Sequence, residues 1–139
     1  MTNSSRLIRT PNHEVLLAYG RDDEGAMSLR RADEAFLPCG FGVCRTHSGP
    51  ATIRRIEQGG LAGAVLCTDE RDIDGLSLIR IIRSIDVHLP CWLVTRRATR
   101  QTLEAALSLK VKSVMTHPVE VGMLVLALRK VLVQQDSQS

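Results

Sequence analysis

Short apolar runs alternate with amphipathic segments along this chain, and that alternation constrains the fold more than any other feature. The five apolar runs are residues 14–19, 41–45, 63–67, 91–95 and 111–116. The internal runs are nearly continuous, which is typical of strands covered on both faces. Segments with helical spacing of apolar residues follow at about 24–37, 50–58, 75–85, 99–109 and 119–134. The pattern predicts an α/β fold, with a parallel five-stranded sheet and helices on both of its faces.

Residues that start and stop helices support these boundaries. Ser48 and Thr99 each precede a helical segment, and their hydroxyl groups can cap its first turn. Gly59 and Gly60 follow the second helical segment, as glycine often does at a helix C-terminus. The short connections and the right-handed rule for parallel crossovers leave few topologies.

The chain is long enough for one domain with its own core. It has 139 residues, of which 44% are hydrophobic and 24% charged, as is usual for a globular protein. We expect the domain to span residues 13–134. Residues 1–12, which are polar and include Pro11, predict a flexible N-terminal tail, and residues 135–139 predict a disordered C-terminal tail.

Composition argues against nucleic-acid and membrane partners. The formal net charge is +3, from 18 basic and 15 acidic residues, which is too small to indicate nucleic-acid binding. No run approaches the roughly 18 apolar residues of a membrane span, and the N-terminus lacks the apolar segment of a signal peptide. Four cysteines without a C-x-x-C pair are typical of a reducing compartment. We therefore expect a cytoplasmic protein.

Three motifs lie at the ends of the predicted strands. The stretch A-V-L-C-T-D-E-R-D-I-D-G at 64–75 ends the third strand at Cys67 and opens the next helix after Asp74. Thr95 ends the fourth strand, and His117-Pro118 ends the fifth. In open α/β sheets, ligands bind at the carboxyl ends of the strands, so these residues are the candidates for a site.

These motifs and their spacing resemble the receiver domain of bacterial two-component response regulators, the CheY-like family. The resemblance covers about Glu14 to Val133. The D-I-D-G sequence at 72–75 is similar to the P-D-M-D-G loop of that family, and His117-Pro118 to its Lys-Pro pair. The resemblance implies a flavodoxin-like (βα)5 fold with strand order 2-1-3-4-5.

The resemblance also implies a set of phosphotransfer residues. In receivers, an aspartate at the end of the third strand accepts the phosphoryl group, and two acidic residues after the first strand hold Mg²⁺. Eight positions before Gly75, the acceptor position holds Cys67. The acidic pair corresponds to Tyr19 and Gly20. A thiol, a phenol and a glycine do not supply the hard oxygen ligands that Mg²⁺ requires.

The switch positions have changed as well. His117 takes the place of the lysine before Pro118, and Val114 takes that of the switch aromatic; Thr95 alone retains the family residue. We therefore expect a pseudo-receiver with no phosphotransfer, no enzyme activity, and no metal or other cofactor.

Two alternatives remain open. A shifted alignment would offer Asp22, Asp23 and Asp69 as carboxylates for a weak cation site or for phosphate, although a helix cap and a solvated loop explain them as well. A thiol-based redox sensor at Cys67, with His117 nearby, is the second alternative.

The last helical segment predicts a contact with another protein. A stripe of Leu124, Leu128 and Val131 is enough to cover the sheet, which leaves more apolar residues for a second face. These residues are Val121, Val125 and Leu132, and the alternative is that neighbouring elements simply cover them. In receivers, the fourth helix, fifth strand and fifth helix form the usual partner or dimer surface, so the resemblance implies a protein partner or a homodimer there.

Basic residues lie around the fourth helix. Arg96, Arg97 and Arg100, together with Lys110 and Lys112, predict a basic edge suited to an acidic partner or to nucleic acid. More often, such charges form a solvated face. The sequence hypothesis is therefore a protein-interaction module in bacterial signal transduction.

Overall fold

The computed structural model describes residues 14–20, 29, 32–68 and 73–138. Its centre is a parallel five-stranded sheet in the order β2-β1-β3-β4-β5. The strands are β1 (Glu14–Ala18), β2 (Gly42–Thr46), β3 (Leu61–Cys67), β4 (Cys91–Thr95) and β5 (Ser113–Thr116). The fold class and strand order expected from the sequence are confirmed.

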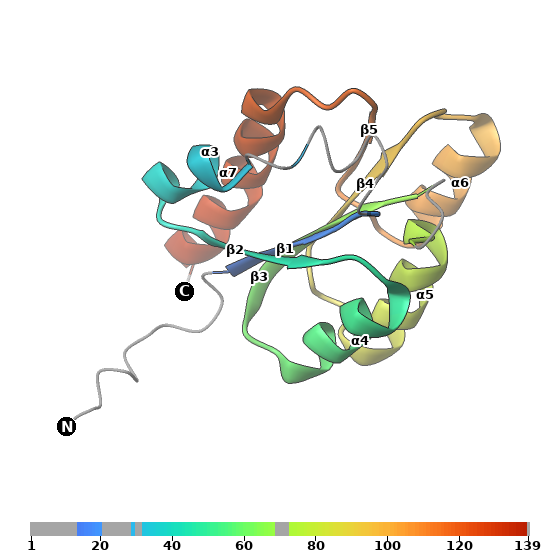
Figure 1. Ribbon diagram of the computed structural model, residues 1–139, viewed down its shortest axis with the longest axis horizontal. Coiled ribbons are helices and arrows are strands. Elements are labelled where there is room, and N and C mark those ends of the chain that lie inside the picture. Colours follow the sequence, from blue (N-terminus) through green and yellow to red (C-terminus); the bar gives the residue numbers. More distant parts are fainter. Residues whose placement is uncertain (1–13, 21–28, 30–31, 69–72, 139) are drawn as a thin grey trace.

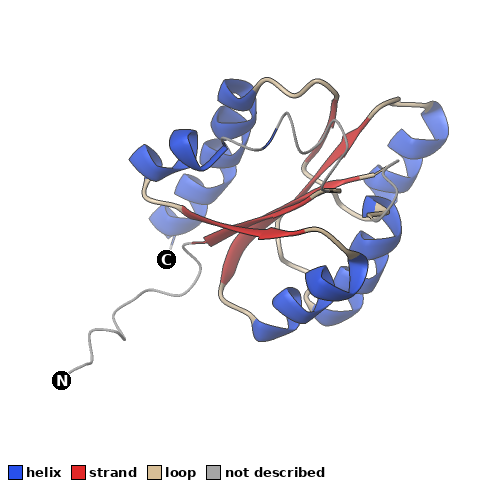
Figure 2. Ribbon diagram, viewed as in Figure 1, coloured by secondary structure: helices blue, strands red, loops and turns tan. Residues whose placement is uncertain are grey.

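Helices cover both faces of the sheet (Figures 1 and 2). One face carries α3 (Ala32–Phe36), which continues into the 3-10 turn η1 (Leu37–Cys39), and α7 (Val121–Gln138). The other carries α4 (Gly49–Gln58), α5 (Gly75–Ile85) and α6 (Arg100–Ser108). Among the described helices, none has the length and apolarity that crossing a membrane requires.

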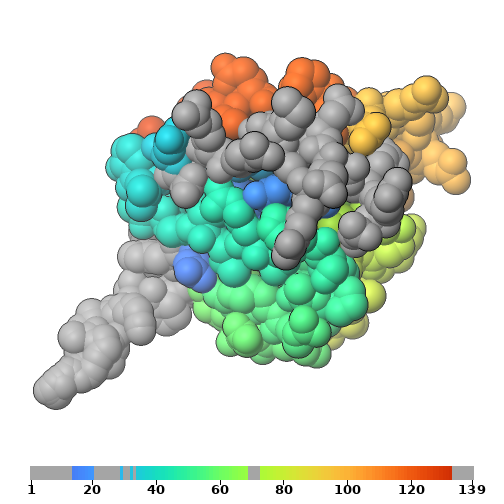
Figure 3. Space-filling model, viewed as in Figure 1, coloured from blue at the N-terminus to red at the C-terminus, as the bar shows by residue number. Residues whose placement is uncertain are grey.

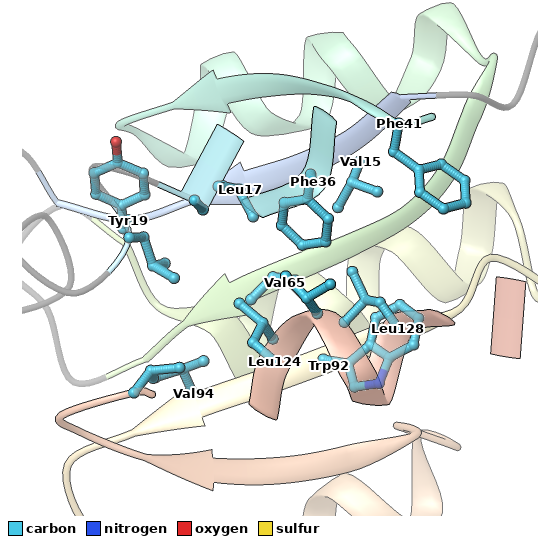
Figure 4. Packing of buried hydrophobic residues seen from close by; sticks show 14 of the residues in the cluster. Val15, Leu17, Tyr19, Phe36, Phe41, Val65, Trp92, Val94, Leu124 and Leu128 are labelled. Atoms are coloured by element: carbon cyan, nitrogen blue, oxygen red, sulfur yellow. The ribbon is translucent and has the colours of Figure 1, made fainter. Parts of the chain in front are cut away.

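Successive side chains of each strand point to opposite faces of the sheet, so the core consists of two clusters. Val65 and Cys67 of β3 pack toward α3 and α7, whereas Ala64 and Leu66 pack toward α4, α5 and α6. Trp92 is the largest fully buried side chain, and Figure 4 shows it close to Leu128 of α7. Because both layers are apolar, β3 is buried along its whole length, as a central parallel strand requires.

Most of the predicted boundaries agree with the structure, but the predicted end of the last helix does not. The predicted elements 75–85 and 91–95 coincide with α5 and β4. The last helix runs to Gln138, so the prediction of a disordered tail from residue 135 is wrong for the backbone of 135–138. The segment contains no glycine or proline to stop the helix, and glutamine is a good helix former. The predicted N-terminal tail and the start of the helix at 24–37 lie outside the described residues.

The predicted helix caps are present. The Ser48 hydroxyl accepts a hydrogen bond from Ala51 N at 3.3 Å, and the Thr99 hydroxyl accepts one from Thr102 N at 3.1 Å. Gly59 ends α4 with φ of 74°, a conformation that glycine adopts without steric cost. These contacts set the helices in place at the carboxyl ends of β2 and β4.

One arginine holds two loops together at the amino-terminal end of the sheet. The Arg83 guanidinium donates to Leu89 O at 2.8 Å and Asp86 O at 3.3 Å in the α5–β4 loop. It also donates to Leu109 O at 2.8 Å and Lys110 O at 3.4 Å in the α6–β5 loop. Because carbonyl groups at helix C-termini lack partners within the helix, a cation that binds several of them stabilises both loops.

Gly75 allows α5 to approach the end of β3. A Cβ atom at this position would lie 2.7 Å from Cys67 O and 2.9 Å from Leu93 Cδ1. Both distances are shorter than van der Waals contact, and the carbonyl belongs to the central strand. Gly75 therefore sets the distance between α5 and the sheet.

We expect Gly75→Ala to lower the free energy of unfolding by about 2 kcal/mol, since overpacking at a rigid contact usually costs about 1–3 kcal/mol. Gly122→Ala is the matched control, because its Cβ would meet only the flexible Glu120 side chain, at 2.9 Å. Alanine is the better helix former, so this variant is expected to be neutral or slightly more stable. Denaturant unfolding of both variants measures the difference, and equal effects would contradict the role of Gly75.

Candidate functional site

The sequence-predicted site residues gather at the carboxyl edge of the sheet. Tyr19 and Gly20 follow β1, Cys67 ends β3, Thr95 ends β4, and His117 follows β5. Backbone hydrogen bonds extend the ladder at this edge, from Thr68 N to Val94 O at 2.8 Å and from His117 N to Thr95 O at 3.0 Å. The fold therefore brings together the positions that the sequence pattern singled out.

Cys67 is fully buried in the cluster beneath α3 and α7. It pairs with Val94 of β4, and β4 separates β3 from the strand that leads to His117. Adjacent strands lie about 4.8 Å apart, so two spacings separate the backbones of the Cys67 and His117 strands. Thiol oxidation depends on solvent access, and this thiol has none.

Tyr19 fills the end of β1 with an aromatic ring. The ring is 4% exposed and lies at one end of the cluster shown in Figure 4. Its hydroxyl accepts a hydrogen bond from Arg45 Nε at 3.0 Å, and His47 packs edge-on at a centroid distance of 4.9 Å. A guanidinium group thus binds the side chain at a position that the receiver pattern assigns to an acidic residue.

Sequence reasoning did not identify the polar cluster at the end of β2. The Thr46 and Thr52 hydroxyl oxygens lie 2.7 Å apart, and Thr52 also donates to Ser48 O at 2.8 Å. His47 Nδ1 lies 3.0 Å from Tyr19 O, where its N–H can donate to the carbonyl. The polar run R-T-H-S at 45–48 was the available signal, but its pairing with Tyr19 and Thr52 depends on the tertiary fold.

The hydroxyl group of Thr95 is bonded within its own loop. Thr95 is fully buried; its Oγ1 donates to Arg97 O at 3.0 Å and accepts from Arg97 N at 3.3 Å. The loop after β4 therefore folds back over the one family residue that the site retains.

The other switch positions that the resemblance implies lie in the edge strand β5 and directly after it. Val114 is half-buried and packs against the cluster beneath α4, α5 and α6. His117 is half-buried and Pro118 exposed, with a cis peptide bond between them. Val114 is thus part of the packing on one face of the sheet.

The structure describes one carboxylate of the acidic loop, Asp74, and it caps α5. Its Oδ2 accepts from Ser77 Oγ at 2.8 Å, and its Oδ1 accepts from Thr68 Oγ1 at 3.3 Å and Ser77 N at 3.4 Å. Partial burial alone would raise the pKa of Asp74, but the hydrogen bonds from Ser77, Thr68 and the Leu76 N–H outweigh it, and the pKa is lowered.

The other candidate carboxylates, Asp22, Asp23 and Asp69, lie outside the described residues. Within the ranges the structure describes, no group of three or more His, Cys, Asp or Glu side chains is arranged to hold a metal ion.

Two of the predicted interface residues are core residues. Val125 is 9% exposed and Leu132 is 2% exposed, so the prediction that they form a surface patch is wrong. Val121 is half-buried and packs against the same cluster. The apolar stripe of α7 is wider than the sequence suggested, because α3 as well as the sheet covers it. Among the side chains of α7 that the structure describes, the exposed large apolar residues are Met123, at 62%, and Leu126, at 51%.

The predicted basic edge divides into two parts. Arg96, Arg97 and Arg100 are all exposed, at the start of α6, which forms the edge of the molecule in Figure 3. Arg100 pairs with Glu104 at 3.1 Å on the helix surface. Lys110 and Lys112 are exposed at the opposite end of α6, so they belong to the amino-terminal edge of the sheet instead.

Solved structures similar to this chain include receiver domains. The chain is similar to a CheY-like response regulator receiver domain from Methanospirillum hungatei JF-1, with a TM-score of 0.78 and 16% identity over 92% of this chain and 99% of that one. It is also similar to a two-component response regulator from Clostridium difficile, with a TM-score of 0.76, 16% identity, and coverage of 89% and 98%. A sensor protein from Polaromonas sp. JS666 gives 0.71, 24% identity, and coverage of 87% and 97%.

No family model matches the sequence, and no curated protein matches it either. At these levels of identity the structural likeness establishes the fold: the chain has the flavodoxin-like receiver fold of two-component response regulators.

Asp74→Ala is expected to destabilise the protein by about 1 kcal/mol at neutral pH, as loss of an N-cap does. The pKa of Asp74 is lowered from its ordinary value of 3.8, so its contribution is complete above that value. It is lost as the pH falls through the lower pKa of the folded state. Unfolding curves at a series of pH values measure the effect. Asp74→Ser is the control, because serine keeps a capping oxygen and does not titrate; a pH-independent gap between wild type and Asp74→Ser would contradict this account.

Proposed function

We propose that this chain is a degenerate receiver, a cytoplasmic protein-interaction module of two-component signal transduction that carries out no phosphotransfer. The observation that carries the proposal is the replacement of the acceptor by Cys67, which is fully buried. The receiver fold itself follows from the sheet order and from the similar solved structures.

Chemistry at the acceptor position supports the proposal. Phosphotransfer to a receiver needs a nucleophile that a phosphodonor can reach and a divalent cation to neutralise the transferring group. The Cys67 side chain offers no solvent access, and a sulfur atom is a poor ligand for Mg²⁺.

The residues at the end of β1 support it independently. The Arg45 guanidinium donates to the Tyr19 hydroxyl at 3.0 Å, so the side chain at one position of the missing acidic pair is used for internal structure. A phenol and the glycine at position 20 do not supply the carboxylate oxygens that Mg²⁺ prefers.

The switch residues favour a domain with one conformation. The Thr95 hydroxyl both donates to and accepts from the Arg97 backbone, and Val114 has no aromatic ring that could follow a moving hydroxyl. We infer that docking alone, without a phosphorylation-driven change of shape, transmits the signal.

The proposed docking surface flanks β5. Among the described side chains of α6 and α7, the exposed large apolar residues are Leu103, Leu107, Met123 and Leu126. Arg96, Arg97 and Arg100 border the α6 side with positive charge, and Arg100 pairs with Glu104. An apolar surface with a basic border suits a protein partner that carries acidic groups around an apolar contact. A second copy of the chain is the other candidate occupant.

Incubation with a small phosphodonor and Mg²⁺ is expected to leave the intact mass of the protein unchanged. Cys67→Asp is expected to behave in the same way, because Tyr19 and Gly20 still supply no carboxylate for the cation. A receiver with an intact acidic pair is the positive control for the phosphodonor. A stoichiometric, acid-labile adduct on the wild-type chain would overturn the proposal and favour a carboxylate such as Asp69.

Alkylation of the native protein separates the proposal from a redox sensor. Cys39 and Cys44 are half-buried and are expected to react, whereas Cys67 and Cys91 are buried and are expected to be protected. Burial also raises the pKa of Cys91 to about 11, which keeps it a thiol at neutral pH. The mass of each cysteine-containing peptide after labelling shows which cysteines have reacted. Labelling in denaturant is the control that shows that all four cysteines can react. Modification of Cys67 in the native state would support the redox alternative.

A further inference from the structure

A cavity lies at the opposite end of the sheet from the candidate site. It has a volume of about 290 Å³ and lies between the α5–β4 and α6–β5 loops. The lining residues are Arg83, Val87, His88, Ser108, Leu109 and Lys110. This volume is close to the lower end of the range in which small-molecule sites occur.

The walls of this cavity are held in place without a ligand. Arg83 donates to carbonyl groups of both loops, at 2.8 Å to Leu89 O and 2.8 Å to Leu109 O. The α6–β5 loop is held further by the hydrogen bond from Lys112 N to Cys91 O at 2.8 Å. A ligand that enters a pre-formed cavity loses less free energy to ordering than one that must assemble its site.

The polar groups that line the cavity suit a ligand that accepts hydrogen bonds. Arg83 already occupies the carbonyl groups of both loops, so these do not need a donor from a ligand. Lys110 carries three N–H donors and no acceptor, and the His88 ring adds a further polar edge. Asp86 does not line the cavity, and its Oδ1 accepts from His88 N at 2.9 Å.

The remaining walls are apolar. Val87 is 58% exposed and Leu109 is half-buried, and both line the cavity. An exposed valine beside a leucine provides a surface that an apolar ligand would remove from water.

We propose that this cavity binds a small organic anion with an apolar body, such as a single-ring aryl carboxylate. The carboxylate contacts Lys110 and His88, and the ring lies between Val87 and Leu109. This site is independent of the proposed docking function, since it lies at the other edge of the sheet.

Titration of the ¹⁵N-labelled chain with benzoate tests the proposal. We expect a dissociation constant of about 1 mM, a common strength for a single-ring ligand, with amide shifts confined to the six lining residues and their neighbours. Benzamide keeps the ring without the charge, and acetate keeps the charge without the ring, so both are expected to bind at least about fivefold more weakly. Shifts elsewhere, no shifts, or equal binding of benzoate and benzamide would overturn the proposal.

A variant of Lys110 separates loss of binding from loss of the fold. Lys110 has a φ of 60°, which glycine adopts more readily, so Lys110→Gly is expected to be at least as stable as wild type. It is expected to weaken benzoate binding by about tenfold, because the charged contact is lost. Lys112→Gln removes an exposed charge that does not line the cavity and is expected to change binding less than twofold. Unchanged benzoate binding by folded Lys110→Gly, or an equal loss of affinity in both variants, would overturn the proposal.

Discussion

Burial of β3 on both faces is the constraint on which the rest of the structure depends. Every residue of this strand is buried, and helices pack on either side of it. Close approach is allowed at two glycines: a Cβ at Gly63 would lie 2.8 Å from the Trp92 ring, and one at Gly75 would lie 2.7 Å from Cys67 O. The strand therefore ends in a closely packed position, where an uncompensated charge would be costly. Cys67 satisfies this environment as a small apolar side chain.

The same packing explains the character of the carboxyl edge of the sheet. Tyr19 extends the core to the end of β1 and places its hydroxyl on Arg45, while Thr95 is bonded to its own loop. Both of these described side chains are therefore used for internal structure. The polar contacts at this edge stabilise the junctions between strands and helices.

The two ends of α6 have different properties. Its start lies at the edge of the molecule among exposed arginines, beside apolar residues of α6 that the described structure leaves uncovered. Its end is bound to α5 through Arg83 and borders a cavity. One helix thus borders both the proposed docking surface and the proposed ligand site.

Local chemistry determined much of this fold from the sequence alone. The near-continuous apolar runs gave the strands, and Ser48, Asp74 and Thr99 marked helix starts that the hydrogen bonds confirm, because capping acts within one turn. The proposed replacement of the acceptor by Cys67 also rests on the sequence alone, since the D-I-D-G spacing is local. Only the tertiary structure decided that Val125 and Leu132 are buried while Met123 and Leu126 are exposed. Helical spacing gives the direction of an apolar stripe, but its width depends on which neighbours cover it. The contact between Tyr19 and Arg45 and the role of Arg83 in two loops likewise depend on residues far apart in the chain, which only the packed sheet brings together.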